Sequence, residues 1–112
     1  MNTTVQRKNK TVIIEVEGQV DGTNSRKLYS TIQTSVKHHD KIVILDLKKL
    51  KYISSAGLRV ILLIARTLQN QKTQLAACSL TNEIQKIFTI SGFHQLLKVY
   101  NTREQALAAL QG

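Results

Sequence analysis

Two adjacent serines, Ser54 and Ser55, are the residues of this chain best placed for chemistry at a hydroxyl group. An apolar segment, 42–45, precedes them, and a longer apolar segment, 60–65, follows them. We therefore expect the serines in a loop between a strand and a buried helix, where hydroxyl groups can cap the free N–H groups of the first turn. A helix N-terminus also favours negative charge, so a phosphate on one of these serines would be tolerated there. Capping and phosphorylation are both open to this pair.

Two of the seven acidic residues lie where a site at a sheet edge would need them. Asp46 ends the apolar strand before the serines, and Asp21 lies in a loop after an earlier strand. In an open α/β sheet, the loops at one set of strand ends gather into a single site. Asp21, Asp46 and Ser55 are therefore candidate neighbours, and the alternative for Asp46 is a turn or cap residue.

The usual enzyme signatures are absent from the sequence. There is no glycine-rich phosphate loop with a lysine and no His-Glu-x-x-His pair, and Cys78 is the single cysteine. The serine loop is not a nucleophile elbow, because Ile53 stands two residues before Ser55. His38 and His39 are adjacent and point to different faces, so we interpret them as the decoration of a helix end. We predict a protein that is not an enzyme and that has no metal site and no cofactor.

The composition is typical of one small globular domain. The chain has 112 residues, of which 42% are hydrophobic, and it has no proline, so we expect a single domain over 1–112. A single cysteine fits a reducing compartment, no apolar segment approaches membrane-spanning length, and the N-terminus lacks the apolar core of a signal peptide. We therefore expect a cytoplasmic protein without a membrane span.

The net charge of +9 raises the question of a nucleic acid or anionic membrane partner. The sixteen basic residues are spread from Arg7 to Arg103, and the only tight group is Lys48, Lys49 and Lys51. That group lacks the interleaved aromatic residues of a single-strand stacking surface. We favour a generally basic, solvated surface and expect no nucleic acid partner.

The elements that position the serine loop can be read from the spacing of apolar and turn residues. We expect strands within 3–8, 11–17, 41–47, 74–78 and 97–100, and helices over 24–38, 57–69, 82–91 and from 103 onward. Gly18 is expected to end the second strand, and residues 48–51 are expected to form a basic connection. Strands that alternate with helices indicate an α/β domain with a sheet that is at least partly parallel.

Four stretches of this chain resemble the STAS family of anti-sigma-factor antagonists. They are residues 18–21 (Gly-Gln-Val-Asp), 44–47 (Ile-Leu-Asp-Leu), 52–62 around the two serines, and 87–93 before the last strand. The resemblance covers essentially the whole chain. It implies a single STAS-like α/β domain without catalytic activity. Such a domain has a mixed sheet of about four to five strands, with about four helices packed mainly on one face.

The resemblance also implies a switch. In such antagonists an anti-sigma factor serine kinase phosphorylates one serine of this loop, and a PPM-type serine phosphatase removes the phosphate. The unphosphorylated antagonist binds the kinase and releases a sigma factor or another client. The family motif Asp-Ser-x-Gly-Leu places the phosphoacceptor at Ser55, with Ser54 as the second choice, although Ser54 stands where the family has aspartate. The partner-binding residues are then Asp21, Gly22, Thr23, Asn24, Ser54, Ala56, Gly57, Leu58 and Arg59.

One alternative function stays open. The missing aspartate and the basic surface also fit a STAS subunit that does not switch and belongs to a larger assembly, such as a lipid-transport transporter complex or a stressosome-like particle. In either case Arg59 and the Lys48, Lys49 and Lys51 group border the loop and can supply charge for an acidic partner. We favour a monomer.

Overall fold

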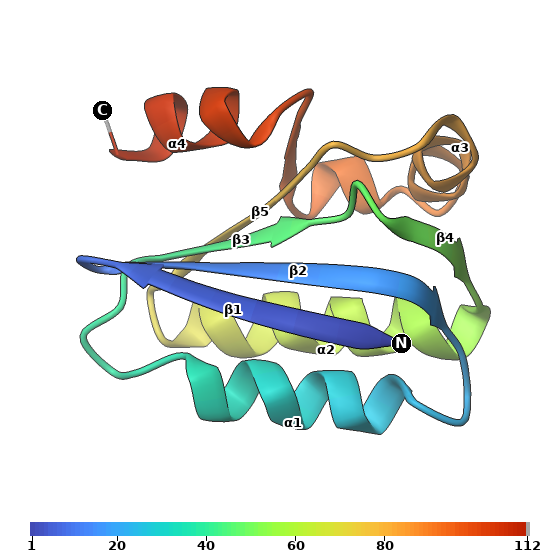
Figure 1. The fold of residues 1–112 in the computed structure, drawn as a ribbon, viewed down its shortest axis with the longest axis horizontal. Helices are drawn as coiled ribbons and strands as arrows, with labels where there is room; N and C mark the ends of the chain where they lie inside the picture. Colours follow the sequence, from blue (N-terminus) through green and yellow to red (C-terminus); the bar gives the residue numbers. More distant parts are fainter. Residues whose placement is uncertain (112) are drawn as a thin grey trace.

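The computed structural model describes residues 1–111 as a twisted sheet with helices on both sides (Figure 1). The elements along the chain are β1 (Asn2–Lys8), β2 (Thr11–Val20), α1 (Ser25–Ser35), β3 (Ile42–Asp46), β4 (Leu50–Ile53), α2 (Ser55–Asn70), β5 (Gln74–Cys78), α3 (Asn82–Ile90), a short 3₁₀ helix (Phe93–Gln95), β6 (Lys98–Tyr100) and α4 (Arg103–Gln111). The predicted α/β class is confirmed.

The sheet is mixed and has six strands. The order is β1-β2-β3-β5-β6, and β4 pairs with the end of β2 outside this path. β1 is antiparallel to β2, whereas the other pairs are parallel. The extra strand is β4, whose first residues were expected to belong to a basic connection. β4 was missed because it has four residues with two exposed side chains in its centre, a pattern without the alternation of a strand.

Gly18 does not end β2, and that prediction is wrong. It lies inside the strand with a φ of +95°, next to a register shift between Gly18 and Gln19. Glycine adopts this φ without the steric cost of a Cβ, so the strand can bend and continue to Val20. The Gly18 N–H donates to the Lys49 carbonyl at 2.9 Å. The bend therefore lets β2 exchange its partner β3 for β4.

The larger hydrophobic core lies between the sheet and the helices α1 and α2 (Figure 1). Apolar residues four apart on α1, Leu28 and Ile32, face the sheet, as do Ile61, Ile64 and Leu68 on α2. α3 adds two buried side chains to the same core. Among the helices within residues 1–111, α4 alone packs against the opposite face, where a smaller cluster surrounds its Ala106. The prediction of helices mainly on one face is confirmed.

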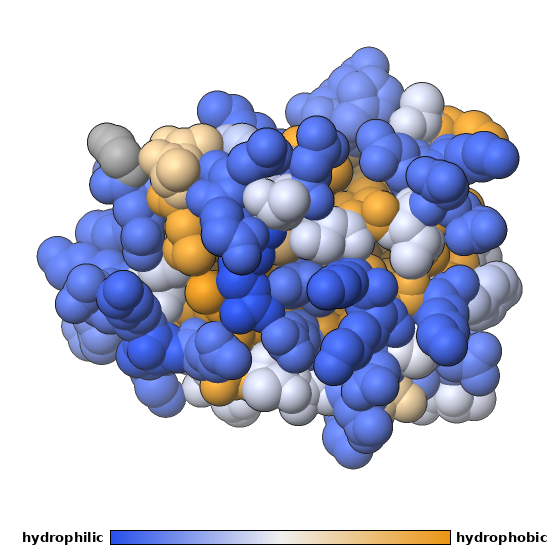
Figure 2. Space-filling view, turned by 45° about the horizontal axis from the view of Figure 1, so that its top comes forward, coloured by the Kyte–Doolittle hydropathy of each residue, from blue (hydrophilic) through white to orange (hydrophobic). Residues whose placement is uncertain are grey.

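Hydrophilic side chains dominate the face of the molecule that Figure 2 shows, with smaller apolar areas between them. None of the helices within residues 1–111 combines the length and the apolar character needed to cross a membrane.

Candidate functional site

The serine loop joins β4 to α2, and its backbone is fixed at both ends. The Ser54 N–H donates to the Val20 carbonyl at 2.9 Å, which ties the loop to the end of β2. The Ser54 carbonyl accepts from the Leu58 N–H at 2.9 Å, the first bond of the helix. Ser54 is the N-cap of α2, and its hydroxyl oxygen accepts from the Gly57 N–H at 3.2 Å. Of the two serines, Ser54 therefore does the capping.

Ser55 is the first residue of α2 and its side chain is exposed. Its hydroxyl makes no hydrogen bond to any other residue of the described chain 1–111. The first turn of α2 holds no acidic residue, so no carboxylate within that turn offsets the positive end of the helix dipole. The geometry therefore leaves one free hydroxyl at a position that favours a bound negative charge.

Gly57 is buried under the loop and sets how closely α2 approaches the sheet. A Cβ at this position would lie 2.7 Å from Cγ1 of Ile53 and 2.9 Å from Cγ1 of Val20. Contacts this short do not occur for real Cβ atoms, so the close approach requires glycine. Gly57 shapes the loop from inside. The expected partner-binding residues of α2 that reach solvent are Ala56 and Leu58, which are partly exposed, and Arg59, which is exposed.

The loop from β2 to α1 is held by its own side chains. The Thr23 N–H and hydroxyl donate to Asp21 Oδ1 at 2.9 and 2.6 Å, and these bonds lower the pKa of Asp21 below its usual value. Asn24 Oδ1 accepts from the Asp21 N–H at 2.9 Å, and its Nδ2 donates to the Gln19 carbonyl at 3.0 Å. Asn24 is the N-cap residue of α1, but its side chain bonds within the loop and makes no capping hydrogen bond. Gly22 and Thr23 form its exposed tip.

The two loops lie at the same end of the molecule (Figure 1). β2 and β4 run parallel with Val20 opposite Ile53, so Asp21 and Ser54 leave the sheet side by side. The structure therefore brings the 21–24 loop next to the serine loop, as the sequence predicted for Asp21 and Ser55.

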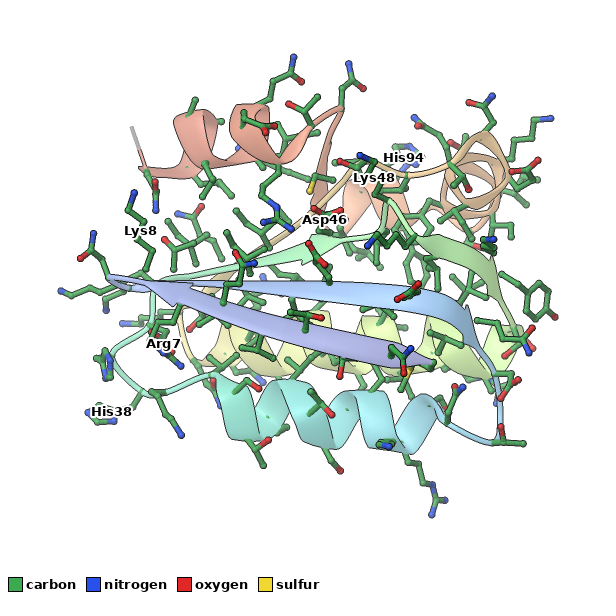
Figure 3. The ribbon with its side chains drawn as sticks, viewed as in Figure 1. Arg7, Lys8, His38, Asp46, Lys48 and His94 are labelled. Carbon is green, nitrogen blue, oxygen red and sulfur yellow. The ribbon has the colours of Figure 1, made fainter. Side chains whose placement is uncertain are left out.

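Asp46 does not join this site, and that expectation is wrong. It pairs with Glu15, five residues before the end of β2, which is about 16 Å back along the strand. Asp46 Oδ1 accepts from the Lys48 N–H at 3.1 Å, which is the turn role given as its alternative. Asp46 Oδ2 accepts from Arg103 Nε at 2.9 Å, and Arg103 also pairs with Glu15. Figure 3 shows Asp46 beside Lys48, away from the end of the molecule where β4 meets α2.

Sequence reasoning did not single out Arg103. Its partners Asp46 and Glu15 lie 57 and 88 positions away, so no local pattern signals the cluster. The three residues anchor the start of α4 to β2 and β3. Because the Arg103 cation is paired with both carboxylates, we interpret the three residues as a structural ion cluster.

The described residues offer no ready metal site. No group of three or more His, Cys, Asp and Glu side chains within 1–111 is arranged to hold a metal ion. Cys78 is buried in the smaller cluster, and burial together with the nearby charge of Asp46 raises the pKa of its thiol to about 11. The polar chemistry at the serine loop is therefore that of hydroxyl and backbone groups.

Comparison with known proteins places this geometry in a family. Residues 2–106 match the STAS domain. BtrV of Bordetella bronchiseptica, whose name assigns it provisionally to the anti-sigma factor antagonists, is 37% identical over 111 residues. The alignment covers 99% of this chain and 96% of BtrV.

Solved structures share the fold. SpoIIAA, a Bacillus cell fate determinant and anti-sigma factor antagonist, superimposes in its unphosphorylated form with a TM-score of 0.81 at 20% identity, covering 99% of this chain and 97% of SpoIIAA. Its phosphorylated form superimposes with a TM-score of 0.71 at 18% identity, covering 97% and 99%. With a domain match along nearly its whole length and a relative of this similarity, the chain belongs to the STAS domain family, among relatives named as anti-sigma factor antagonists.

Proposed function

We propose that this protein is an anti-sigma factor antagonist whose binding to an anti-sigma factor serine kinase is switched by phosphorylation of Ser55. The unphosphorylated form binds the kinase and releases a sigma factor or another client, and a PPM-type serine phosphatase restores it. One observation carries this proposal: Ser55 presents an exposed hydroxyl without a hydrogen-bond partner within residues 1–111, whereas the neighbouring Ser54 hydroxyl is used in capping α2.

The electrostatics of the loop support a phosphate at Ser55. A phosphate brings nearly two negative charges, and the N-terminus of α2 favours them. Arg59 is exposed one turn further along the helix, at the spacing where side chains of a helix meet. The fold need not change on phosphorylation. The change is confined to a contact surface, where a partner shaped for a neutral hydroxyl meets a charged group.

Ser54 in place of the family's aspartate keeps the cap but removes a charge. Serine and aspartate cap helices about equally well, so the loop retains its shape. A kinase that acts on Ser55 must therefore accept a neutral residue before the phosphoacceptor. Phosphorylation of Ser54 itself would replace the hydroxyl that accepts from the Gly57 N–H.

The test is intact-mass measurement and peptide mapping after incubation with ATP and an extract of the organism that makes this protein. Wild type, Ser55→Ala and Ser54→Ala are compared in the same extract. We expect one phosphate on wild type and on Ser54→Ala, located at Ser55, and none on Ser55→Ala. No phosphate on any variant, in an extract that phosphorylates a control antagonist, would favour the subunit of a larger assembly instead.

Binding to the kinase then separates the two states. We expect Ser55→Asp to weaken binding by about 100-fold, which corresponds to about 3 kcal/mol, and Ser55→Ala to preserve it. Isothermal titration calorimetry measures both affinities. Equal affinities for the two variants would contradict the switch.

A further inference from the structure

A groove of about 690 Å³ lies beside the last half of α2, far from the serine loop. Its walls come from α2, the first residues of β5, segment 94–98 and the end of α4. Gln69 of α2 lines it, and Gln69 is 14 residues after Ser55, which is about 21 Å along a helix. The groove is therefore separate from the site of the proposed switch.

The groove offers an apolar anchor point. Leu96 lines it with 52% of its side chain exposed, and Leu75 of β5 lines it partly buried. Phe93 and Leu97 on either side are buried in the core, so the segment that presents Leu96 is held in place. An isolated exposed leucine is ordinary, but one fixed at the wall of a hollow can be covered by a bound side chain.

The charge of the groove has one sign. Lys72 and Lys98 line it, and no aspartate or glutamate does. Within residues 1–111, neither lysine takes part in a salt bridge, because the ion pairs there are formed by Arg7, Arg103 and His39. The groove thus combines an apolar wall with cations that have no internal partner.

We propose that this groove docks an acidic segment of a partner protein. An apolar side chain of the segment would lie against Leu75 and Leu96, and its carboxylates would face Lys72 and Lys98. A second copy of this chain fits less well, because each copy carries a net charge of +9 and the two copies repel each other. The protein would then have two docking surfaces, one at each end of α2.

The test is a titration of the full ¹⁵N-labelled chain with a synthetic peptide that alternates glutamate and leucine, followed by ¹H–¹⁵N NMR. We expect shifts at the amides of Leu75, Leu96 and Lys98, and none over 54–59. A peptide with serine in place of leucine and a peptide with lysine in place of glutamate should both bind at least fivefold more weakly. Equal binding of the leucine-free peptide would overturn the proposal in favour of diffuse attraction by charge.

Matched variants locate the contact. Leu96→Ser should weaken binding of the glutamate–leucine peptide at least fivefold. Ile90→Ser is the control and should leave binding unchanged, because Ile90 is a side chain of similar size that is 86% exposed on α3. Lys98→Gln should weaken binding of the peptide, and Lys86→Gln should not, since Lys86 lies on α3 outside the groove. Equal effects of a variant and its control would overturn the proposal.

Two further measurements exclude other occupants. The first is an NMR titration with decanoate. If decanoate shifts the same amide signals more strongly than the peptide does, the groove binds a small amphiphile. Shifts of these amides with protein concentration alone would assign it to a second copy. Either result overturns the proposal. Ser55→Asp should leave the peptide affinity unchanged, so failure of this inference and failure of the Ser55 switch are measured separately.

Discussion

At the scale of single residues, the two serines divide the work between them. The Ser54 hydroxyl accepts a backbone N–H and so stabilises the start of α2, while the Ser55 hydroxyl stays available at the surface. This division explains how the loop can carry a modification without losing its shape. The structural role sits on one side chain and the proposed regulatory role on the next.

The capping role leads to a stability prediction. Ser54→Ala removes the acceptor for the Gly57 N–H and should lower the free energy of unfolding by about 1 kcal/mol. Ser54→Asp should retain the wild-type free energy of unfolding, because a carboxylate also accepts this hydrogen bond and interacts favourably with the helix dipole. Urea denaturation measures both, with Ser55→Ala as the control that leaves the cap intact. A Ser54→Ala variant as stable as wild type would show that the cap is not made in solution.

Gly57 leads to a second stability prediction at this scale. Gly57→Ala should destabilise the fold by about 1–3 kcal/mol, because the new Cβ meets Ile53 and Val20 at distances below 3 Å. Gly22→Ala is the matched control, since a Cβ at Gly22 has no neighbour within 4 Å. Thermal unfolding followed by circular dichroism compares the two. A loss of similar size in both variants would argue against the packing explanation.

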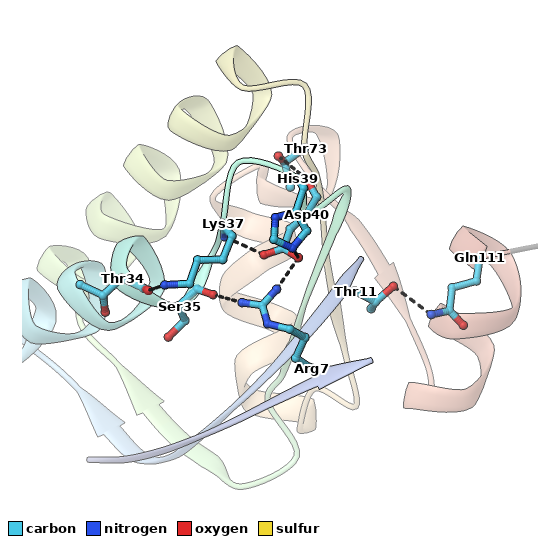
Figure 4. A network of polar contacts seen from close by, with 9 residues as sticks. All are labelled: Arg7, Thr11, Thr34, Ser35, Lys37, His39, Asp40, Thr73 and Gln111. Carbon is cyan, nitrogen blue, oxygen red and sulfur yellow. Dashed lines mark hydrogen bonds and ion pairs between the residues drawn. The ribbon is translucent and has the colours of Figure 1, made fainter. Parts of the chain in front are cut away.

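At the scale of elements, an ion pair with a buried carboxylate helps to hold the N-terminal strand β1 in place (Figure 4). The Arg7 guanidinium of β1 pairs with Asp40 and also donates to the Ser35 carbonyl at the end of α1. Asp40, whose side chain is fully buried, accepts from the Lys37 N–H at 2.6 Å. Burial alone would raise the pKa of Asp40, but the bonds from Arg7 and Lys37 outweigh it and lower that pKa. β1 is thereby joined to the α1–β3 connection as well as to β2.

This ion pair predicts how stability depends on pH. Since the pKa of Asp40 in the folded state lies below its usual value near 4, the pair stabilises fully above pH 4 and is lost as the pH falls further. Asp40→Asn should therefore lower the free energy of unfolding by about 1–3 kcal/mol at pH 7, and the difference from wild type should shrink below pH 4.

Hydrogen exchange shows whether β1 is the element affected. Amides of β1 should exchange faster in Asp40→Asn than in wild type at pH 7, while those of β5 keep most of their protection. Glu83→Gln, at an exposed carboxylate on α3, is the control and should change the exchange of neither the β1 nor the β5 amides. Loss of protection spread evenly over all strands would indicate a general loss of stability instead.

At the scale of the whole molecule, the surface charge is more positive than the ion pairs can balance. Three of the seven carboxylates, on Glu15, Asp40 and Asp46, are occupied by Arg7 or Arg103. Within residues 1–111, most of the sixteen basic side chains therefore face solvent without a partner carboxylate. A surface of this kind speeds the approach of an acidic partner at low salt.

The positive charge beside the serine loop should affect the rate of association with the partner. Arg59→Gln should slow association with the proposed partner, an anti-sigma factor kinase, about two- to fivefold at low ionic strength, and the difference should shrink with added salt. Lys8→Gln is the matched control, because Lys8 lies at the other end of the molecule, as Figure 3 shows. Stopped-flow or surface plasmon measurements give the rates. Equal slowing by both variants would assign the effect to net charge alone.

Much of the architecture could be predicted from the sequence because its signals are local. The spacing of Leu28 and Ile32 marks the buried side of α1, and segment 74–78 was predicted with the bounds that β5 has. The polar pair at 54–55, before an apolar helix, also marked the candidate site. The strand β4 and the continuation of β2 past Gly18 could not be predicted, because both depend on pairing between strands far apart in the chain.

By itself the sequence determined the fold class, the family motif and the two candidate serines, since apolar period and cap chemistry act within a few residues of one another. Only the tertiary structure decided which serine keeps a free hydroxyl. It also separated Asp46 from the serine loop, because β2 continues beyond the end of β3 and pairs there with β4. The Arg103 cluster and the Arg7–Asp40 pair were likewise decided there. Their partners lie 33 to 88 positions apart, and only folding of the chain brings such charges within bonding distance.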